Sequence, residues 1–141
     1  MTTITQAKEI LYAAFVAGWG TTTPYQLDNE DGTDSLNEDP ANGDVSWVRV
    51  VVRNETFGQK TLGQKGNRKF TREGRLLIQV FTLANTGTKD SDVLSQKLVD
   101  MFEGEKFSGV WVNELTPRGI GNDGKWYQAL CDGTFEYEEV K

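Results

Sequence analysis

Residues 75–83 read Arg-Leu-Leu-Ile-Gln-Val-Phe-Thr-Leu, a short run rich in apolar, β-branched and aromatic side chains with turn-forming residues on both sides. Such a composition favours a β-strand. Few of its positions are polar, as expected where both faces of a sheet are at least partly covered. Residues 47–53, Trp-Val-Arg-Val-Val-Val-Arg, have the same character. The sequence therefore predicts two central strands around which the chain packs.

An amphipathic stretch before these strands predicts a helix over residues 4–17. Its apolar positions, spaced by three or four residues, are Ala7, Ile10, Leu11, Ala14 and Phe15. This spacing places them on one stripe of a helix. Thr3 and Gln6 can form a capping box at its start, and Gly18 is placed to end it.

A second helix is predicted over residues 91–103, after the central strands. Its apolar stripe consists of Leu94, Leu98, Met101 and Phe102. Ser91 or Asp90 can cap its start and Gly104 can end it.

Two further strands are predicted after the second helix, over residues 110–115 and 125–137, with Asn122-Asp123-Gly124 as the hairpin turn. The last strand has a period of two, since Tyr127, Ala129, Cys131, Phe135 and Tyr137 share one face. The order of elements predicts an α+β fold, a mostly antiparallel β-sheet with two helices packed on one face and a long basic β-hairpin arm. A chain of 141 residues fits a single domain, residues 1–141.

The composition excludes several kinds of chemistry. The sequence contains no His and one cysteine, Cys131. His-based nucleophilic triads, His-ligated metals, intrachain disulfides and zinc sites built on several thiolates are therefore ruled out. Cys131 falls on an apolar strand face, where a buried structural thiol is expected. We expect neither an enzyme nor a bound cofactor or metal. Without a targeting signal or an apolar run long enough for a membrane, we expect a soluble intracellular protein.

Two motifs fail on inspection. Residues 58–65 have the glycine spacing of a phosphate-binding loop, but Gln64 stands where the lysine is required. Aligning Gly32 with the invariant glycine of an EF-hand puts Leu27 at the first ligand position, where an oxygen is required. The sequence thus predicts neither site.

Charge is segregated along the chain, whose formal net charge is −6. Between Leu27 and Ser46 lie seven acidic residues and no Lys or Arg: Asp28, Glu30, Asp31, Asp34, Glu38, Asp39 and Asp44. The segment from Arg53 to Arg75 contains seven basic residues and only two acidic ones, Glu55 and Glu73; the basic residues are Arg53, Lys60, Lys65, Arg68, Lys69, Arg72 and Arg75. We expect a long exposed acidic loop over residues 28–44, either functional or disordered, and a long hairpin arm or mobile loop over residues 54–74.

These two segments suggest a protein that self-associates. Unlike charges on two extended loops allow each subunit to present one loop to its neighbour, and complementary potentials set orientation and register. An alternative is a nucleic-acid-binding module that uses the basic arm against phosphates, with a steep dependence on salt. Self-association places the interface residues in both sets named above, whereas the nucleic-acid-binding alternative uses the basic set.

Several segments together resemble phage minor tail proteins of the tail-terminator type. They are Ala17-Gly18-Trp19, Trp47-Val48-Arg49-Val50, residues 70–74 running into 77–81, Asn85-Thr86-Gly87-Thr88, and residues 123–128 with 135–137. The likeness lies in the number and order of these segments, which span nearly the whole chain. The acidic segment is longer than the family pattern leads one to expect.

This resemblance implies a non-enzymatic structural protein of the virion of a long-tailed phage or a prophage. It implies a homohexameric ring that caps the tail tube, stops its polymerisation and joins the tail to the head-neck connector protein. Its partners would be other copies of itself, the tail tube protein and the connector, with DNA only passing through the ring and no membrane contact. A head-completion or other neck protein is the alternative within this class. The protein would reside in the host cytoplasm before assembly and in the virion afterwards.

Overall fold

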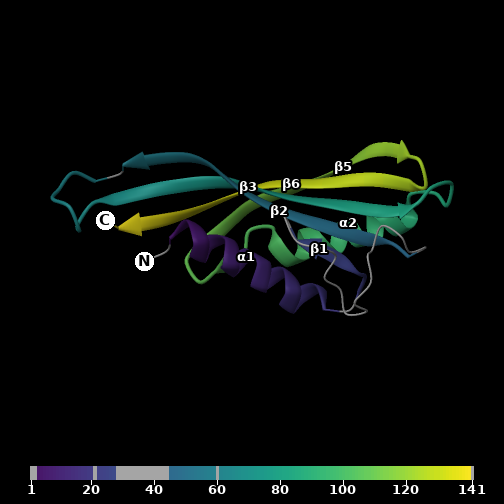
Figure 1. The fold of residues 1–141 in the computed structure, drawn as a ribbon, viewed down its shortest axis with the longest axis horizontal. Helices are drawn as coiled ribbons and strands as arrows, with labels where there is room; N and C mark the ends of the chain where they lie inside the picture. The colour runs from purple at the N-terminus through teal and green to yellow at the C-terminus, as the bar shows by residue number, and fades with distance from the viewer. Residues whose placement is uncertain (1–2, 21, 28–44, 60, 141) are drawn as a thin grey trace.

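A computed structural model describes residues 3–20, 22–27, 45–59 and 61–140. The fold is α+β, as predicted, with two helices and a curled six-stranded mixed sheet in this part of the chain (Figure 1). In chain order its elements are α1 (Ile4–Trp19), β1 (Tyr25–Leu27), β2 (Trp47–Gln59), β3 (Lys69–Leu83), α2 (Lys89–Phe102), β4 (Lys106–Phe107), β5 (Val110–Asp123) and β6 (Trp126–Val140).

The strands are ordered β1-β2-β3-β6-β5-β4 across the sheet. Strand β1 pairs with β2 in parallel, while all the other neighbours in this order are antiparallel. The sequence analysis missed the short strands β1 and β4, which contain too few residues to show an alternating pattern. The central position of β3 is confirmed, because it pairs with β2 on one side and β6 on the other.

Strands β2 and β3 extend well beyond their predicted ends. Pairing continues from Asn54 opposite Gly74 to Gln59 opposite Phe70. Strand β6 runs beside this extension until Val140 lies opposite Lys69. Most of the segment predicted as an arm or mobile loop is therefore paired strand. Only residues 61–68 of it lie outside the strands in the described part of the chain. Figure 1 shows this three-stranded extension at one end of the elongated molecule.

Helix α1 begins as predicted but ends later. Thr3 and Gln6 form the expected capping box, each side chain accepting the other residue's backbone N–H. The helix continues past Gly18, and Gly20, with a φ of 57°, stands at its C-terminus instead. Gly18 serves packing, since a Cβ there would lie 2.7 Å from Met101 Cε of α2.

Helix α2 starts two residues before its predicted first residue. Thr88 is its N-cap residue and makes no side-chain capping bond, whereas Ser91 is buried inside the helix. The prediction that Ser91 or Asp90 caps the helix is therefore wrong. Gly104, with a φ of 73°, follows the C-terminal end as predicted.

One apolar cluster joins both helices to the sheet. Its largest fully buried side chains include Leu11, Phe15 and Trp19 of α1 and Leu98 and Phe102 of α2. The sheet contributes Val48, Val50, Val52, Leu76, Ile78, Val80, Val110, Val112, Leu115, Ala129, Cys131, Phe135 and Tyr137. Each fully buried large apolar side chain contributes roughly 1.5–3 kcal/mol. This cluster is the main source of stability, and it contains Ala129, Cys131, Phe135 and Tyr137 of the face predicted for the last strand but not Tyr127, which is only partly buried.

The curled sheet contains two separate bulges, in β2 and β5, each with a glycine beside it on the neighbouring strand. Register shifts occur between Asn54 and Thr56 of β2 and between Val112 and Leu115 of β5. Gly74 lies beside the first bulge, where a Cβ would be 2.1 Å from the backbone oxygen of Arg53. Gly133 lies beside the second, where a Cβ would be 2.2 Å from the oxygen of Glu114. Bulges and strand glycines permit strand bending and close backbone approach.

Candidate functional site

The sheet face opposite the one that contributes to the apolar cluster is called the open face here. In β3 it comprises every second residue from Lys69, and in β6 the residues directly opposite them, because paired residues in antiparallel strands project to the same side. Glu73 thus lies opposite Glu136, Thr71 opposite Glu138, and Leu77 opposite Asp132. The open face is polar and charged along its middle and along the extension.

The basic residues predicted to form an interface lie in different environments and do not form one continuous positive surface. Arg72 lies on the helix side of the sheet, 7% exposed, and forms an ion pair with Glu139 of β6. Lys69 pairs with Glu138 across 3.8 Å, both side chains being about half exposed. Part of the positive charge counted from the sequence is therefore matched by the last strand.

Arg75 takes part in a second charge cluster on the open face. Its guanidinium lies 3.3 Å from Asp132 Oδ2 and 4.0 Å from Glu55 Oε1. Arg118 of β5 donates to the same Asp132 oxygen. Asp132 is only 9% exposed, so two cations compensate one largely buried carboxylate.

The remaining basic and acidic candidates fall in different places. Arg53 and Lys65 are exposed, and Arg68 is partly buried with its guanidinium 5.9 Å from the ring centroid of Phe70. Lys60 and all seven acidic candidates, Asp28, Glu30, Asp31, Asp34, Glu38, Asp39 and Asp44, lie outside the described residues.

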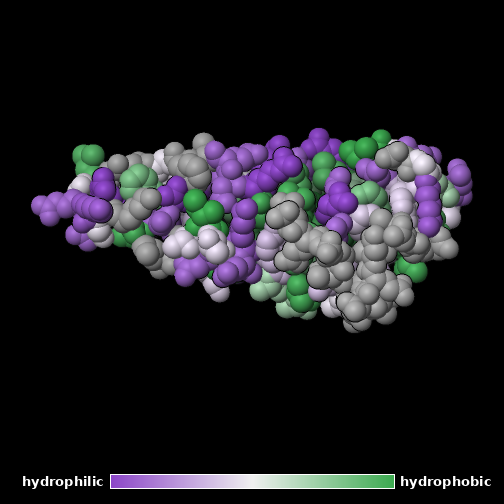
Figure 2. All heavy atoms as spheres, viewed as in Figure 1, coloured by the Kyte–Doolittle hydropathy of each residue, from purple (hydrophilic) through white to green (hydrophobic). Residues whose placement is uncertain are grey.

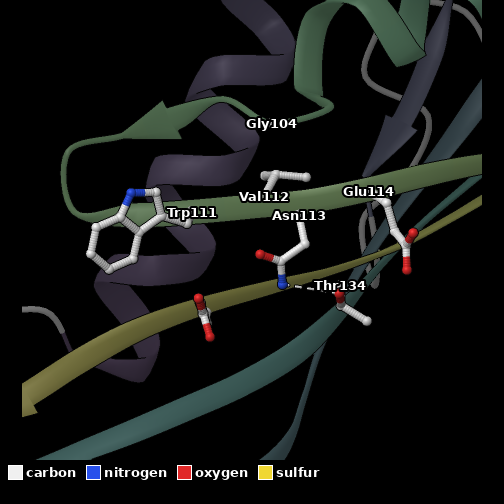
Figure 3. A pocket seen from close by; sticks show the side chains of 7 residues that line it. Gly104, Trp111, Val112, Asn113, Glu114 and Thr134 are labelled. Carbon is white, nitrogen blue, oxygen red and sulfur yellow. Dashed lines mark hydrogen bonds between the residues drawn. The ribbon is translucent and has the colours of Figure 1, made fainter.

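A shallow hollow of about 780 Å³ lies over β5 and β6. We call it the β5–β6 hollow, and its lining residues are Gly104, Trp111, Val112, Asn113, Glu114, Thr134 and Glu136. Figure 3 shows Trp111 and Asn113 on β5, one on each side of Val112 in the sequence. Asn113 Nδ2 donates a hydrogen bond to Thr134 Oγ1 of β6 at 3.2 Å. Because of the bulge in β5, two residues, Asn113 and Glu114, stand opposite the single residue Thr134 of β6.

The hollow continues into two smaller ones of about 240 Å³ each. One shares Trp111 and Glu136 with it and extends along Glu73 and Glu138. The other shares Glu114 and Thr134 and extends to the cluster around Asp132. Together they form a continuous depression along the open face.

Three carboxylates around this depression make no ion pair within the described residues: Glu73, Glu114 and Glu136. Glu73 and Glu136 lie directly opposite each other in β3 and β6. Like charges in such a cross-strand pair are destabilising. Trp111, opposite Glu136 on its other side, is 39% exposed. The depression thus combines uncompensated negative charge with an exposed aromatic ring, a combination suited to a positively charged partner with an apolar group.

The sequence analysis missed this surface. It placed Trp111 in a predicted strand without assigning it to a surface, and in the structure Trp111 is 39% exposed. The available signal was the polar side of the last strand, where Thr134, Glu136 and Glu138 alternate with buried residues. That signal showed an exposed strand face but not which residues of β3 and β5 lie beside it.

At the far end of the extension, residues 61–68 connect β2 and β3 outside the strands; we call residues 61–68 the hairpin tip. The tip has its own hydrogen bonds, from Asn67 N–H to the oxygen of Gln64 at 3.0 Å and from Lys69 N–H to Thr61 Oγ1 at 2.8 Å. Leu62 is 95% exposed within it. Figure 2 shows mainly hydrophilic residues at this end of the molecule.

Cys131 and Tyr137 are buried groups with structural roles. Burial raises the pKa of the Cys131 thiol, and a hydrogen bond with Ser95 offsets part of that rise. Burial likewise raises the pKa of Tyr137, whose hydroxyl donates to Asn54 Oδ1 at 3.1 Å. A thiol that resists ionisation is a poor nucleophile, so Cys131 fits the predicted structural role.

Two further observations concern metals and membranes. No group of three or more Cys, Asp and Glu residues in the described ranges is arranged to hold a metal ion. Within the same ranges, neither helix has the length and apolar character needed to span a bilayer.

Comparison with known proteins gives a fold likeness only. No family model matches the chain, and no curated protein matches it. Chains of solved structures do match, among them one protein without a functional name, with a TM-score of 0.62. The two chains share 13% sequence identity, and the match covers 95% of this chain and 97% of the other. The fold is therefore found in another protein with a largely different sequence.

Proposed function

We propose that this chain is a tail terminator of a long-tailed phage or prophage. Copies of it would form a hexameric ring that caps the tail tube, stops tube polymerisation and joins the tail to the head-neck connector. The role is structural and non-enzymatic, exercised in the virion after assembly in the host cytoplasm. The resemblance of the segments described above supplies this function, and the geometry supports self-assembly.

The observation that carries the proposal is the presence of unlike surfaces on one chain. A projecting hairpin tip stands at one end of the molecule, and an acidic depression with an exposed tryptophan lies on the open face. A closed ring requires a contact of this heterologous kind, in which one patch meets a different patch on the next subunit. In this proposal the two helices cover one sheet face and stabilise the subunit, while the basic hairpin and the open face mediate assembly.

The nucleic-acid-binding alternative has less support. Arg72 is buried against Glu139, while Lys69 and Arg75 lie beside carboxylates. Phosphate binding by these cations would require displacing those carboxylates, and Glu73 and Glu136 on the same face would repel the phosphates. The head-completion alternative remains within the same structural class.

The decisive experiment images the intact particle. We expect cryo-electron microscopy to place six copies of the chain in a closed ring at the head-proximal end of the tail tube. Phage lacking the chain should produce tubes of uncontrolled length. Location in the capsid shell or the baseplate, or tails of normal length without the chain, would refute the proposal.

A further inference from the structure

We propose that the hairpin tip of one copy binds in the β5–β6 hollow of the next copy. Leu62 would pack on Trp111, and Lys65 would lie among Glu73, Glu114 and Glu136. This inference rests on the proposed self-assembly and names the two surfaces that make the contact.

The hollow has the chemistry of a receptor for a cation with an apolar neighbour. Two glutamates without an ion pair among the described residues, Glu114 and Glu136, line it. Glu73, in the smaller hollow next to it, is the cross-strand neighbour of Glu136, and an incoming cation would relieve the repulsion between these two. Trp111 stands directly beside Glu136, and 39% of its surface is exposed. Lys106 Nζ lies over the Trp111 ring, 4.4 Å from its centroid, so an incoming apolar group would pack on the part of the ring that Lys106 leaves exposed. A large, partly exposed ring is the type of residue that commonly anchors an interface.

The hairpin tip offers the complementary groups. Leu62 is 95% exposed, the largest exposed fraction among the large hydrophobic residues of the described chain. Lys65 is exposed three residues later in the same short loop. The hydrogen bonds from Asn67 to Gln64 and from Lys69 to Thr61 hold the loop in shape. Such preorganisation lowers the entropic cost of binding.

The contact must form between two copies rather than within one. The tip begins beyond Lys69, which is four strand residues from Glu73, or about 13 Å at the usual rise per residue. Pairing of β3 with both β2 and β6 holds these strands extended as far as Gln59 opposite Phe70 and Val140 opposite Lys69. The tip therefore cannot fold back onto its own hollow without breaking the sheet.

The first test is disulfide trapping between two differently labelled variants. Leu62→Cys supplies a thiol on the tip, and Asn113→Cys supplies one in the hollow, where Asn113 is exposed. The native Cys131 is fully buried and does not compete. The matched control pairs Leu62→Cys with Val93→Cys, a residue of α2 that is 59% exposed.

We expect mild oxidation of the tip and hollow variants to give the mixed dimer in large excess over the control mixture. Reduction should release it, and mass spectrometry should identify the bond between residues 62 and 113. Equal yields in the two mixtures, including no dimer in either, would overturn the inference.

The second test exchanges the two charges. Lys65→Glu and Glu136→Lys should each weaken self-association, measured by sedimentation over a range of protein concentrations, by at least about tenfold. The chain carrying both changes should associate more strongly than the product of the two single effects predicts, because residues 65 and 136 then regain an opposite pair, although Glu73 and Glu114 still oppose a glutamate at position 65. If the double variant is as weak as the product of the single effects, the two residues do not meet. Circular dichroism and melting temperatures confirm that each variant is folded.

The outcomes separate this inference from the proposed function. Rings at the tail end that persist in all these variants would refute the tip-to-hollow contact and leave the terminator role standing. If Asn113→Cys or Glu136→Lys prevents assembly while Leu62→Cys and Lys65→Glu assemble normally, a partner other than the hairpin tip fills the β5–β6 hollow. A chain found elsewhere in the particle would refute the function, whatever the trapping result.

Discussion

Arg72 and Glu139 form an ion pair that joins β3 to the last residues of β6. Their side chains are 9% and 13% exposed, and the guanidinium of Arg72 also lies 5.9 Å from the centroid of Phe70. The pair anchors the end of the chain to the extension that carries the hairpin tip. A buried ion pair adds little to the free energy of unfolding compared with a pair of well-packed apolar side chains of similar volume. Removal of one partner, however, leaves the other as an uncompensated buried charge.

Loss of one partner of this buried pair should therefore be costly. Arg72→Ala is expected to lower the free energy of unfolding by about 3–5 kcal/mol. Lys69→Ala, which removes the exposed pair with Glu138 on the same two strands, should cost only about 0–1 kcal/mol. Urea unfolding followed by circular dichroism measures both. The double variant Arg72→Met with Glu139→Leu should recover most of the lost free energy of unfolding, because neither charge is then left buried alone. If the double variant is as unstable as Arg72→Ala, this explanation is wrong.

Alanine at either of the two glycines beside the bulges should destabilise the sheet. At Gly74 and Gly133 the new Cβ would lie within 2.2 Å of a backbone oxygen, which cannot move aside as a flexible side chain does. We expect each substitution to reduce the free energy of unfolding by at least about 2 kcal/mol. Gly58→Ala is the matched control, because a Cβ there meets nothing within 4 Å and β2 is extended at that point. Similar melting temperatures for all three variants would disprove the close approach.

Stability should fall in alkaline solution because of Cys131. Its pKa is higher in the folded chain than in the unfolded chain, since burial disfavours the thiolate and the bond with Ser95 offsets this only in part. The stabilisation is therefore complete below the unfolded pKa of about 8.5 and is lost as the pH rises above it, by up to about 1.4 kcal/mol per pH unit. Urea unfolding at pH 7 and at pH 10 should show a larger drop for the wild type than for Cys131→Ala.

Tyr137, whose pKa burial also raises, is present in both proteins, so the difference between them isolates Cys131. Thiol reagents should modify Cys131 only after unfolding. Rapid modification of the folded chain would show that the thiol is accessible.

The end of α1 depends on a buried hydrogen bond. Trp19 Nε1 donates to Thr23 Oγ1 at 3.0 Å, and both side chains are largely buried. Thr23→Val keeps the shape but leaves the indole N–H without its acceptor, which should cost about 1–3 kcal/mol. Thr5→Val, at an exposed position of the same helix, should change stability by no more than about 0.5 kcal/mol. Thermal unfolding of the two variants in parallel tests the difference.

The sequence by itself determined the features that depend on neighbouring residues. Helical spacing around Leu11 and Leu98 located both helices, and the pairing of Thr3 with Gln6 located the first cap. Alternation in the last strand identified the buried face that contains Cys131 and Phe135. These patterns are local because helix and strand periods repeat within a few residues.

The tertiary structure alone decided which charges meet and where the sheet is hollowed. Arg72 pairs with Glu139, and Glu73 lies opposite Glu136, only because β3 and β6 pair in one particular register. The residues of each pair are more than sixty positions apart in the sequence. Counting charges along the chain gave a basic arm, but ion pairs depend on distance in space, and burial of Arg72 is possible only with its partner. Trp111 lies between the buried Val110 and Val112 and so points to the other face of β5, but its neighbours there, Glu136 and beyond it Glu73, are set by the pairing of β5, β6 and β3.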